Sequence, residues 1–259
     1  VQPLIYVYEK SFGLVSDITL LEFSDTNSKL LKGLSEKAPG TFNHSLQVAN
    51  LAEAAANEIG ANSLLVRVGS LYHDIGKINN PTYYSENQKS SISSHEDMTP
   101  EQSARIIIDH VDEGIKIAKK NNIPDRVIDF IRTHHGTNTV YYFYQKAKEL
   151  YGENNVNEKK FKYHGPTPFS KETAILMMAD SVEAASKSLR TPTFEKIQDF
   201  VNQLIDKHVY GKQFEYSNIT LYEIELIKKV LIKRLVNIYQ LRVEYPEWCF
   251  IKKYLLLSA

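Results

Sequence analysis

Apolar residues recur every three or four positions along most of the chain, which is the period of an amphipathic helix. One such stripe runs through Val48, Leu51, Ala55 and Ile59, and Gly60 suits the end of that helix. The same period predicts helices over 63–74 and 140–151, and capping residues predict helix starts at Thr99, Pro124, Ser170, Thr193 and Thr220. Strand signals are weak, so the pattern predicts an all-α helical bundle.

Two long polar stretches interrupt these helices, at 78–98 and 152–170. Both are predicted to be loops, and a loop as long as 78–98 often covers a functional site in a compact domain. The first 40 residues are expected to form an N-terminal segment packed on the bundle. The organisation is then a segment over 1–40 and a helical domain over 41–259, with a single domain overall.

The composition narrows the range of partners. The 259 residues include 31 Lys and Arg against 31 Asp and Glu, so the net charge is near zero. A broad DNA- or RNA-binding face needs a basic excess, so no nucleic-acid polymer is expected as a partner. Cys249 is the only cysteine, which excludes an intramolecular disulfide and fits a reducing compartment.

The chain has no run of about 18 apolar residues, so it is not itself expected to span a membrane. It begins at Val1 rather than at Met, which suggests a fragment of a longer protein.

Five of the eight histidines and two aspartates form a pattern that ordinary structural roles explain poorly. A lone histidine on an apolar face is better explained as a hydrogen-bonded core residue, and a lone aspartate equally well as half of a buried salt bridge. All seven together are better explained as ligands of transition-metal ions, for which imidazole and carboxylate are the usual donors. The set is His44, His73, Asp74, His110, His134, His135 and Asp180.

The adjacent pairs His73–Asp74 and His134–His135 suggest two metal ions rather than one. Neighbours on a helix point about 100° apart, so the members of a pair suit different ions. Asp74 is the natural bridge, since a carboxylate has two oxygens whereas a neutral imidazole offers one lone pair. Two ions about 3.5–4 Å apart can share a hydroxide and clamp a phosphoryl group, so hydrolysis of a phosphate ester is the leading hypothesis. The mixed ligand set suits Mn²⁺ or Fe²⁺ better than Mg²⁺.

The order of His44, His73–Asp74 and Asp180 resembles the H…HD…D signature of HD-domain phosphohydrolases, and the other three histidines resemble its two-metal branch. The stretches 38–62, 68–81, 86–88, 130–138 and 165–189 look very like the cytoplasmic HD domain of PgpH-type seven-transmembrane proteins. Those proteins hydrolyse cyclic di-AMP to linear 5′-pApA. The resemblance covers residues 15–240, most of the chain.

The resemblance implies an HD-domain bundle with a dinuclear metal site in its core. One ion would be held by His44, His73, Asp74 and Asp180, and the other by Asp74, His110, His134 and His135. It also implies that Asp74 and Lys77 are catalytic, that a metal-bridging hydroxide attacks cyclic di-AMP, and that the chain is the cytoplasmic domain of a bacterial inner-membrane protein. A homo-oligomer is compatible with this reading.

Residues that contact the substrate are less clearly marked. Lys77 lies three residues after the His–Asp pair and is expected to face the phosphate, although it could instead be a solvated helix-end lysine. Asn138 and Tyr142 are the candidates for contacts to the nucleotide, although packing in the core is the slightly favoured alternative for Tyr142. His95, His164 and His208 have no partner pattern and are expected in loops or at the surface.

Three alternatives remain open from the sequence. The first is cyclic di-GMP, but the signature of that branch departs from this chain at Thr137–Asn138–Thr139. The second is a guanosine alarmone or a dNTP, against which the three additional histidines argue. The third is a non-catalytic nucleotide sensor, against which the complete set of seven candidate ligands argues.

Overall fold

The computed structural model describes residues 9, 12–88 and 94–239. The serine-rich positions 90–93 of the first predicted loop and Cys249 lie outside the described residues. Within this part of the chain the structure contains helices and no strand, which confirms the predicted all-α class. The α-helices are α2 (Asp17–Ser24), α3 (Lys29–Lys37), α4 (Pro39–Glu58), α5 (Ser63–Tyr72), α6 (Pro100–Lys120), α7 (Asp125–Thr133), α8 (Tyr141–Tyr151), α9 (Lys171–Ser186), α10 (Phe194–Tyr210) and α11 (Leu221–Ile238).

The helix starts follow local capping chemistry. Thr99, Ser170 and Thr220 each accept a hydrogen bond from the backbone three residues on, and the side chain at that position bonds back to the cap. Thr193 caps α10 in the simpler form, with its side chain alone. The predicted starts at these positions are therefore confirmed.

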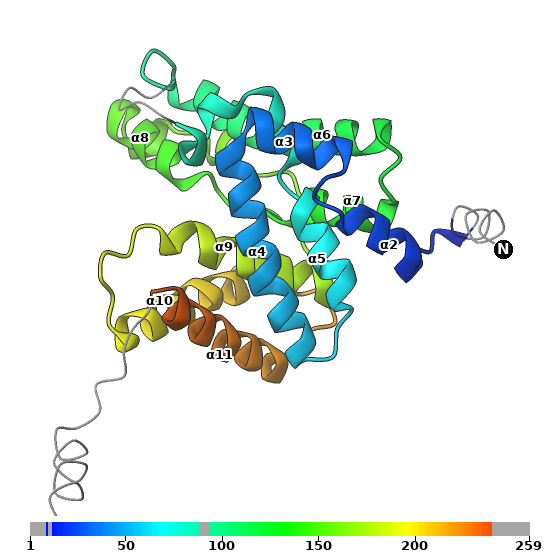
Figure 1. Cartoon of the computed structure of the whole chain (residues 1–259). Helices are drawn as coiled ribbons and strands as arrows, with labels where there is room; N and C mark the ends of the chain where they lie inside the picture. Colours follow the sequence, from blue (N-terminus) through cyan, green and yellow to red (C-terminus); the bar gives the residue numbers. More distant parts are fainter. Residues whose placement is uncertain (1–8, 10–11, 89–93, 240–259) are drawn as a thin grey trace, which may run out of the picture.

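Helix α4 is the central element of the bundle (Figure 1). It packs against α3, α5, α9 and α11. Leu20 of α2 and Leu31 of α3 belong to the same buried apolar cluster as Val48 of α4. The N-terminal helices thus share the core of the bundle. The proposed boundary at residue 40 falls in the first turn of α4 and stays a prediction.

The polar stretch 78–98 is not a plain loop. It contains the short 3-10 helices η2 (Pro81–Tyr83) and η3 (Ser85–Asn87), and it begins within a third, η1 (Ile75–Asn79). η3 lies against the start of α4, where Asn87 Oδ1 accepts a hydrogen bond from the backbone of Thr41 at 3.1 Å. A Cβ on Gly40 would lie 1.8 Å from the carbonyl oxygen of Glu86, so this approach requires glycine.

The second predicted loop, 152–170, also contains secondary structure. It contains η4 (Glu153–Asn155) and η5 (Glu158–Phe161), and an isolated bridge pairs Lys162 with Thr139. Phe161 packs with Phe143 and Ala147 in a small second core beside α8. Among the described residues, no helix combines the length and the apolar character needed to cross a membrane.

Candidate metal centre

The structure brings all seven predicted ligands together in the interior of the bundle. His44 lies on α4, His110 on α6 and Asp180 on α9, whereas His73 and His134 are the residues that end α5 and α7. Six of the seven are buried, and His135 is half-buried. The two doublets therefore lie just beyond helix ends, and the premise that each lies on a helix was wrong.

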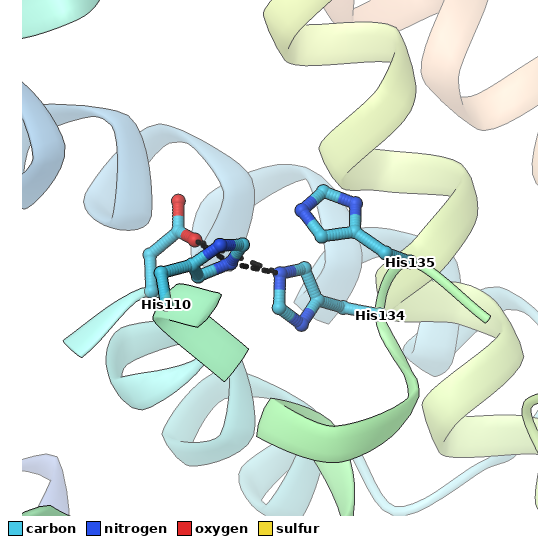
Figure 2. Close-up of side chains that lie close together, drawn as sticks. His110, His134 and His135 are labelled. Atoms are coloured by element: carbon cyan, nitrogen blue, oxygen red, sulfur yellow. Dashed lines mark hydrogen bonds and ion pairs between the residues drawn. The ribbon is translucent and has the colours of Figure 1, made fainter. Parts of the chain in front are cut away.

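The seven side chains form two groups, and within each group the ligand atoms all lie within 4.8 Å of one another. One group is His44, His73 and Asp180, and the other is Asp74, His110, His134 and His135. Figure 2 shows the rings of His110, His134 and His135 close together, with a dashed line joining His110 and His134. Each group offers the number and kind of donors that a divalent transition metal requires.

The carboxylate of Asp74 lies between the two groups. Its Oδ2 atom is 3.6 Å from His44 Nε2 and 3.2 Å from His73 Nε2. Its Oδ1 atom is 3.3 Å from His110 Nε2 and 3.6 Å from His134 Nε2. Each oxygen thus faces a different group, as a bridging ligand would.

The hydrogen bonds of three histidines fix which ring nitrogen faces the centre. His73, His110 and His134 each direct Nδ1 at the carbonyl oxygen three residues earlier, on Ser70, Ile107 and Ile131. A carbonyl only accepts, so Nδ1 carries the proton, and in a neutral ring Nε2 carries a lone pair.

Those lone pairs point at carboxylate oxygens and at each other. His110 Nε2 and His134 Nε2 are 3.2 Å apart, and His73 Nε2 and Asp74 Oδ1 are buried without a hydrogen-bond partner. Facing acceptors repel unless a proton or a cation lies between them. The donor set therefore fits metal ions.

The charges of the two groups differ. Burial raises the pKa of Asp180, but the rings of His44 and His73, 2.9 and 3.6 Å from its Oδ1 atom, outweigh burial and hold that pKa well below its usual range. Burial likewise disfavours the imidazolium form of His73, but the charge of Asp74 dominates and raises the pKa of His73 to about 10. In the other group, burial lowers the pKa of His134 and, more strongly, of His135, so these rings stay neutral. A region that attracts a proton this strongly also attracts a metal cation.

Lys77 is not a solvated helix-end lysine. Its ammonium lies 2.7 Å from Asp74 Oδ2 and 2.9 Å from Glu86 Oε1, and its side chain is only 13% exposed. Burial disfavours its charge, but Asp74 and Glu86 outweigh that effect and raise the pKa of Lys77 well above its usual value. Lys77 is therefore a permanent cation at the edge of the centre.

Two residues at the centre were not singled out from the sequence. Glu183 is buried on α9 and hydrogen-bonds to Nδ1 of His44. Its spacing of three residues from Asp180 was the available signal, because residues three apart share one helix face. Tyr163 stacks on the ring of His135, with centroids 4.2 Å apart, and no sequence pattern marked it.

Two of the predicted surface histidines are buried, so those predictions were wrong. His95 donates from Nε2 to the carbonyl of Tyr83 at 2.9 Å. His208 lies on α10 with Nε2 2.9 Å from the hydroxyl of Ser181. His164 is exposed, as expected.

The candidate substrate residues lie in different surroundings. Asn138 is half-buried, and its side-chain amide is 3.5 Å from Nδ1 of His208. Tyr142 is 71% exposed on α8 and contacts Phe143, so the structure excludes the core-packing alternative for Tyr142.

The sequence of this chain is similar to those of a known domain family and of two curated proteins. The HD domain family matches residues 41–185. The chain is 46% identical over 94% of its length to the "Cyclic-di-AMP phosphodiesterase PgpH" of Listeria monocytogenes, and 41% identical over 94% to that of Bacillus subtilis. It covers 34% of either protein, so it spans about a third of their length.

A solved structure is also similar. The HD domain of the L. monocytogenes phosphodiesterase PgpH, crystallised in complex with cyclic di-AMP, is 48% identical, with a TM-score of 0.78. The match covers 83% of this chain and 99% of that domain. The similarity thus extends over nearly all of that domain.

Proposed function

Because this chain belongs to the HD-domain family, we propose that it is a metal-dependent phosphodiesterase that hydrolyses cyclic di-AMP to linear 5′-pApA. The observation that carries the proposal is the carboxylate of Asp74, whose two oxygens face two separate ligand groups. The PgpH relatives, one of them crystallised with cyclic di-AMP, support the substrate.

The proposed ligands divide as the two groups do. His44, His73 and Asp180 would hold one divalent ion, His110, His134 and His135 would hold the other, and Asp74 would bind both. Mixed imidazole and carboxylate donors favour Mn²⁺ or Fe²⁺. When bound, such ions act as Lewis acids toward phosphoryl oxygens and lower the pKa of bound water.

Lys77 would stabilise the phosphate electrostatically. Two of its three N–H donors are directed at Asp74 and Glu86, which leaves one for a phosphoryl oxygen. Its raised pKa keeps it protonated at neutral pH, so it cannot serve as a general base. Its fixed positive charge would favour the extra negative charge that develops on the phosphoryl group.

Asn138 and Tyr142 remain the proposed contacts to the nucleotide. Asn138 lies three residues after His135, and its side chain is only half-buried. The exposed ring of Tyr142 offers a face on which a base can stack.

We further propose that the chain is the cytoplasmic domain of a bacterial inner-membrane protein. Support comes from its similarity to a third of the length of the PgpH proteins. The absence of a DNA or RNA partner remains a prediction from the balanced charge, and a homo-oligomer remains compatible.

Product analysis tests the proposal. Mn²⁺-loaded protein would be incubated separately with cyclic di-AMP, cyclic di-GMP and pApA, and the products separated by chromatography. We expect pApA from cyclic di-AMP, with kcat/KM at least about tenfold above that for cyclic di-GMP, since buried polar contacts discriminate between purines. Equal rates on cyclic di-AMP and cyclic di-GMP would contradict the proposed substrate and leave only the assignment as a phosphodiesterase. Tight binding of cyclic di-AMP without turnover would favour the alternative of a non-catalytic nucleotide sensor.

A further inference from the structure

The ring of His44 is held from both edges by side chains of one helix. His44 Nε2 lies 2.9 Å from Asp180 Oδ1, and His44 Nδ1 hydrogen-bonds to Glu183 Oε2. Asp180 and Glu183 are three residues apart on α9 and therefore project from the same face. We propose that Glu183 is a positioning residue that fixes the orientation and tautomer of His44 for metal binding. This inference rests on the metal binding proposed above.

The hydrogen bond to Glu183 determines which nitrogen of His44 is available to a metal ion. A neutral imidazole has one N–H, and an ionised carboxylate can only accept, so Nδ1 carries the proton. The lone pair on Nε2 is then directed at Asp180 Oδ1, with Asp74 Oδ2 3.6 Å away. Three acceptors that converge in this way form a cation site, whereas the opposite tautomer would place a proton between His44 and Asp180.

His44 differs in this respect from three other histidines of the centre. The Nδ1 atoms of His73, His110 and His134 donate to backbone carbonyls, whereas that of His44 donates to a carboxylate. A carboxylate is the stronger acceptor and makes the opposite nitrogen a better electron donor. His44 is therefore expected to be the most strongly donating of these four imidazoles.

Glu183 is itself held in place. It is buried, and Lys187, the residue that follows the end of α9, lies 3.0 Å from Glu183 Oε2. The contact with Lys187 offsets part of the cost of burying the Glu183 carboxylate. The arrangement Lys187–Glu183–His44 thus extends from the surface to the proposed metal site.

The effect should be confined to one ion. Glu183 contacts His44, which belongs to the group with His73 and Asp180, whereas no residue of the second group lies on α4 or α9. Removing Glu183 should therefore weaken the ion held by His44 and leave the second ion in place.

Metal titration of the full chain tests this inference without depending on turnover. Metal-stripped wild type, E183A and E183Q would be titrated with Mn²⁺ by isothermal calorimetry, with E53Q as control. Glu53 lies on α4, the helix that carries His44. Its carboxylate pairs with Arg67 at 2.9 Å, away from the proposed ligands. In E183A we expect one ion to bind about 10- to 100-fold more weakly and the other to be unchanged. E183Q keeps a neutral acceptor and should lose less, though still at least about threefold.

A second readout separates positioning from simple helix packing. Nitrogen-15 NMR of the imidazole rings reports the tautomer, and His44 should be protonated on Nδ1 in wild type and E53Q but not in E183A. If E183A does not fold, the isosteric E183Q decides by its affinity. Unchanged affinity for both ions in the folded variants, or equal weakening of both, would overturn the inference. Failure of the wild type to bind any ion would instead overturn the proposed function.

Discussion

The close approach of η1 to α6 offers a direct test of how tightly the backbone sets the metal centre. Gly76 lies two residues after Asp74, and a Cβ built on it would be 1.9 Å from the carbonyl oxygen of His110 and 2.6 Å from the backbone nitrogen of Gly114. These obstacles are backbone atoms of α6, so no side-chain rotation can relieve the clash. Gly76→Ala should therefore push α6, and His110 with it, away from Asp74.

The structure gives the size of this displacement. An ordinary contact begins near 3.4 Å, so the carbonyl of His110 must move by the difference from 1.9 Å, which is about 1.5 Å. Metal–ligand distances tolerate only about 0.2 Å. Overpacking of this kind typically costs about 1–3 kcal/mol of stability, and misplacement by about 1 Å can cost about 100-fold in rate.

Gly33→Ala is the matched control. Gly33 lies within α3, and its added Cβ would meet only Ile78 Cδ1, at 3.9 Å. Alanine is favoured over glycine in a helix by about 1 kcal/mol, so this variant should be as stable as wild type or slightly more so.

The assay compares both variants with wild type after loading with Mn²⁺ and removal of free metal. We expect Gly76→Ala to hold about one ion per chain by elemental analysis and to hydrolyse cyclic di-AMP about 100-fold more slowly. Circular dichroism would show whether the variant remains helical. Two ions and full activity in a folded Gly76→Ala chain would refute the claim that the contact between η1 and α6 sets the ligand geometry.

Three further substitutions test two residues of the site and one buried histidine outside it. Asp74→Ala should lower the metal content and reduce turnover by at least about 1,000-fold, because both ligand groups face this carboxylate; near-normal turnover would contradict a bridging role. Lys77→Met should lower kcat while elemental analysis still finds two ions, because Lys77 is not among the candidate ligands; unchanged kcat would exclude it from catalysis. Burial, and then the charge of Lys207, lowers the pKa of His208 from 6.5 to about 4, so the folded state resists protonation. Wild type should lose about 2 kcal/mol more stability than His208→Gln when the pH falls from about 7 to 5, measured by urea unfolding; equal losses would contradict this.

The seven candidate ligands, which the structure brings together, could be picked out from the sequence because each carries a local signal. His44 and His110 lie at helical spacing from apolar residues, and the doublets are recognisable as pairs. Capping boxes at Thr99, Ser170 and Thr220 marked helix starts for the same reason, since the partners are three residues apart.

Several of the misses depend on contacts between distant parts of the chain. Glu183 and His44 are 139 residues apart, so no local pattern could pair them. His208 appeared solvent-facing because its partner, Ser181, comes from another helix. The stretch 78–98 looked like a loop because η3 is held by the start of α4 rather than by its own periodicity.

The ends of α5 and α7 supply the centre with more than His73 and His134. Both helices terminate at these residues, so the carboxyl end of each lies beside the ions that the two groups are proposed to hold. A helix carboxyl end carries roughly half a negative charge, so the backbone contributes about one further unit without any acidic side chain. Transplanting the seven ligands onto an unrelated helical scaffold would omit this contribution. A designer who wished to reproduce the affinity of the centre would have to copy the helix termini together with the ligands.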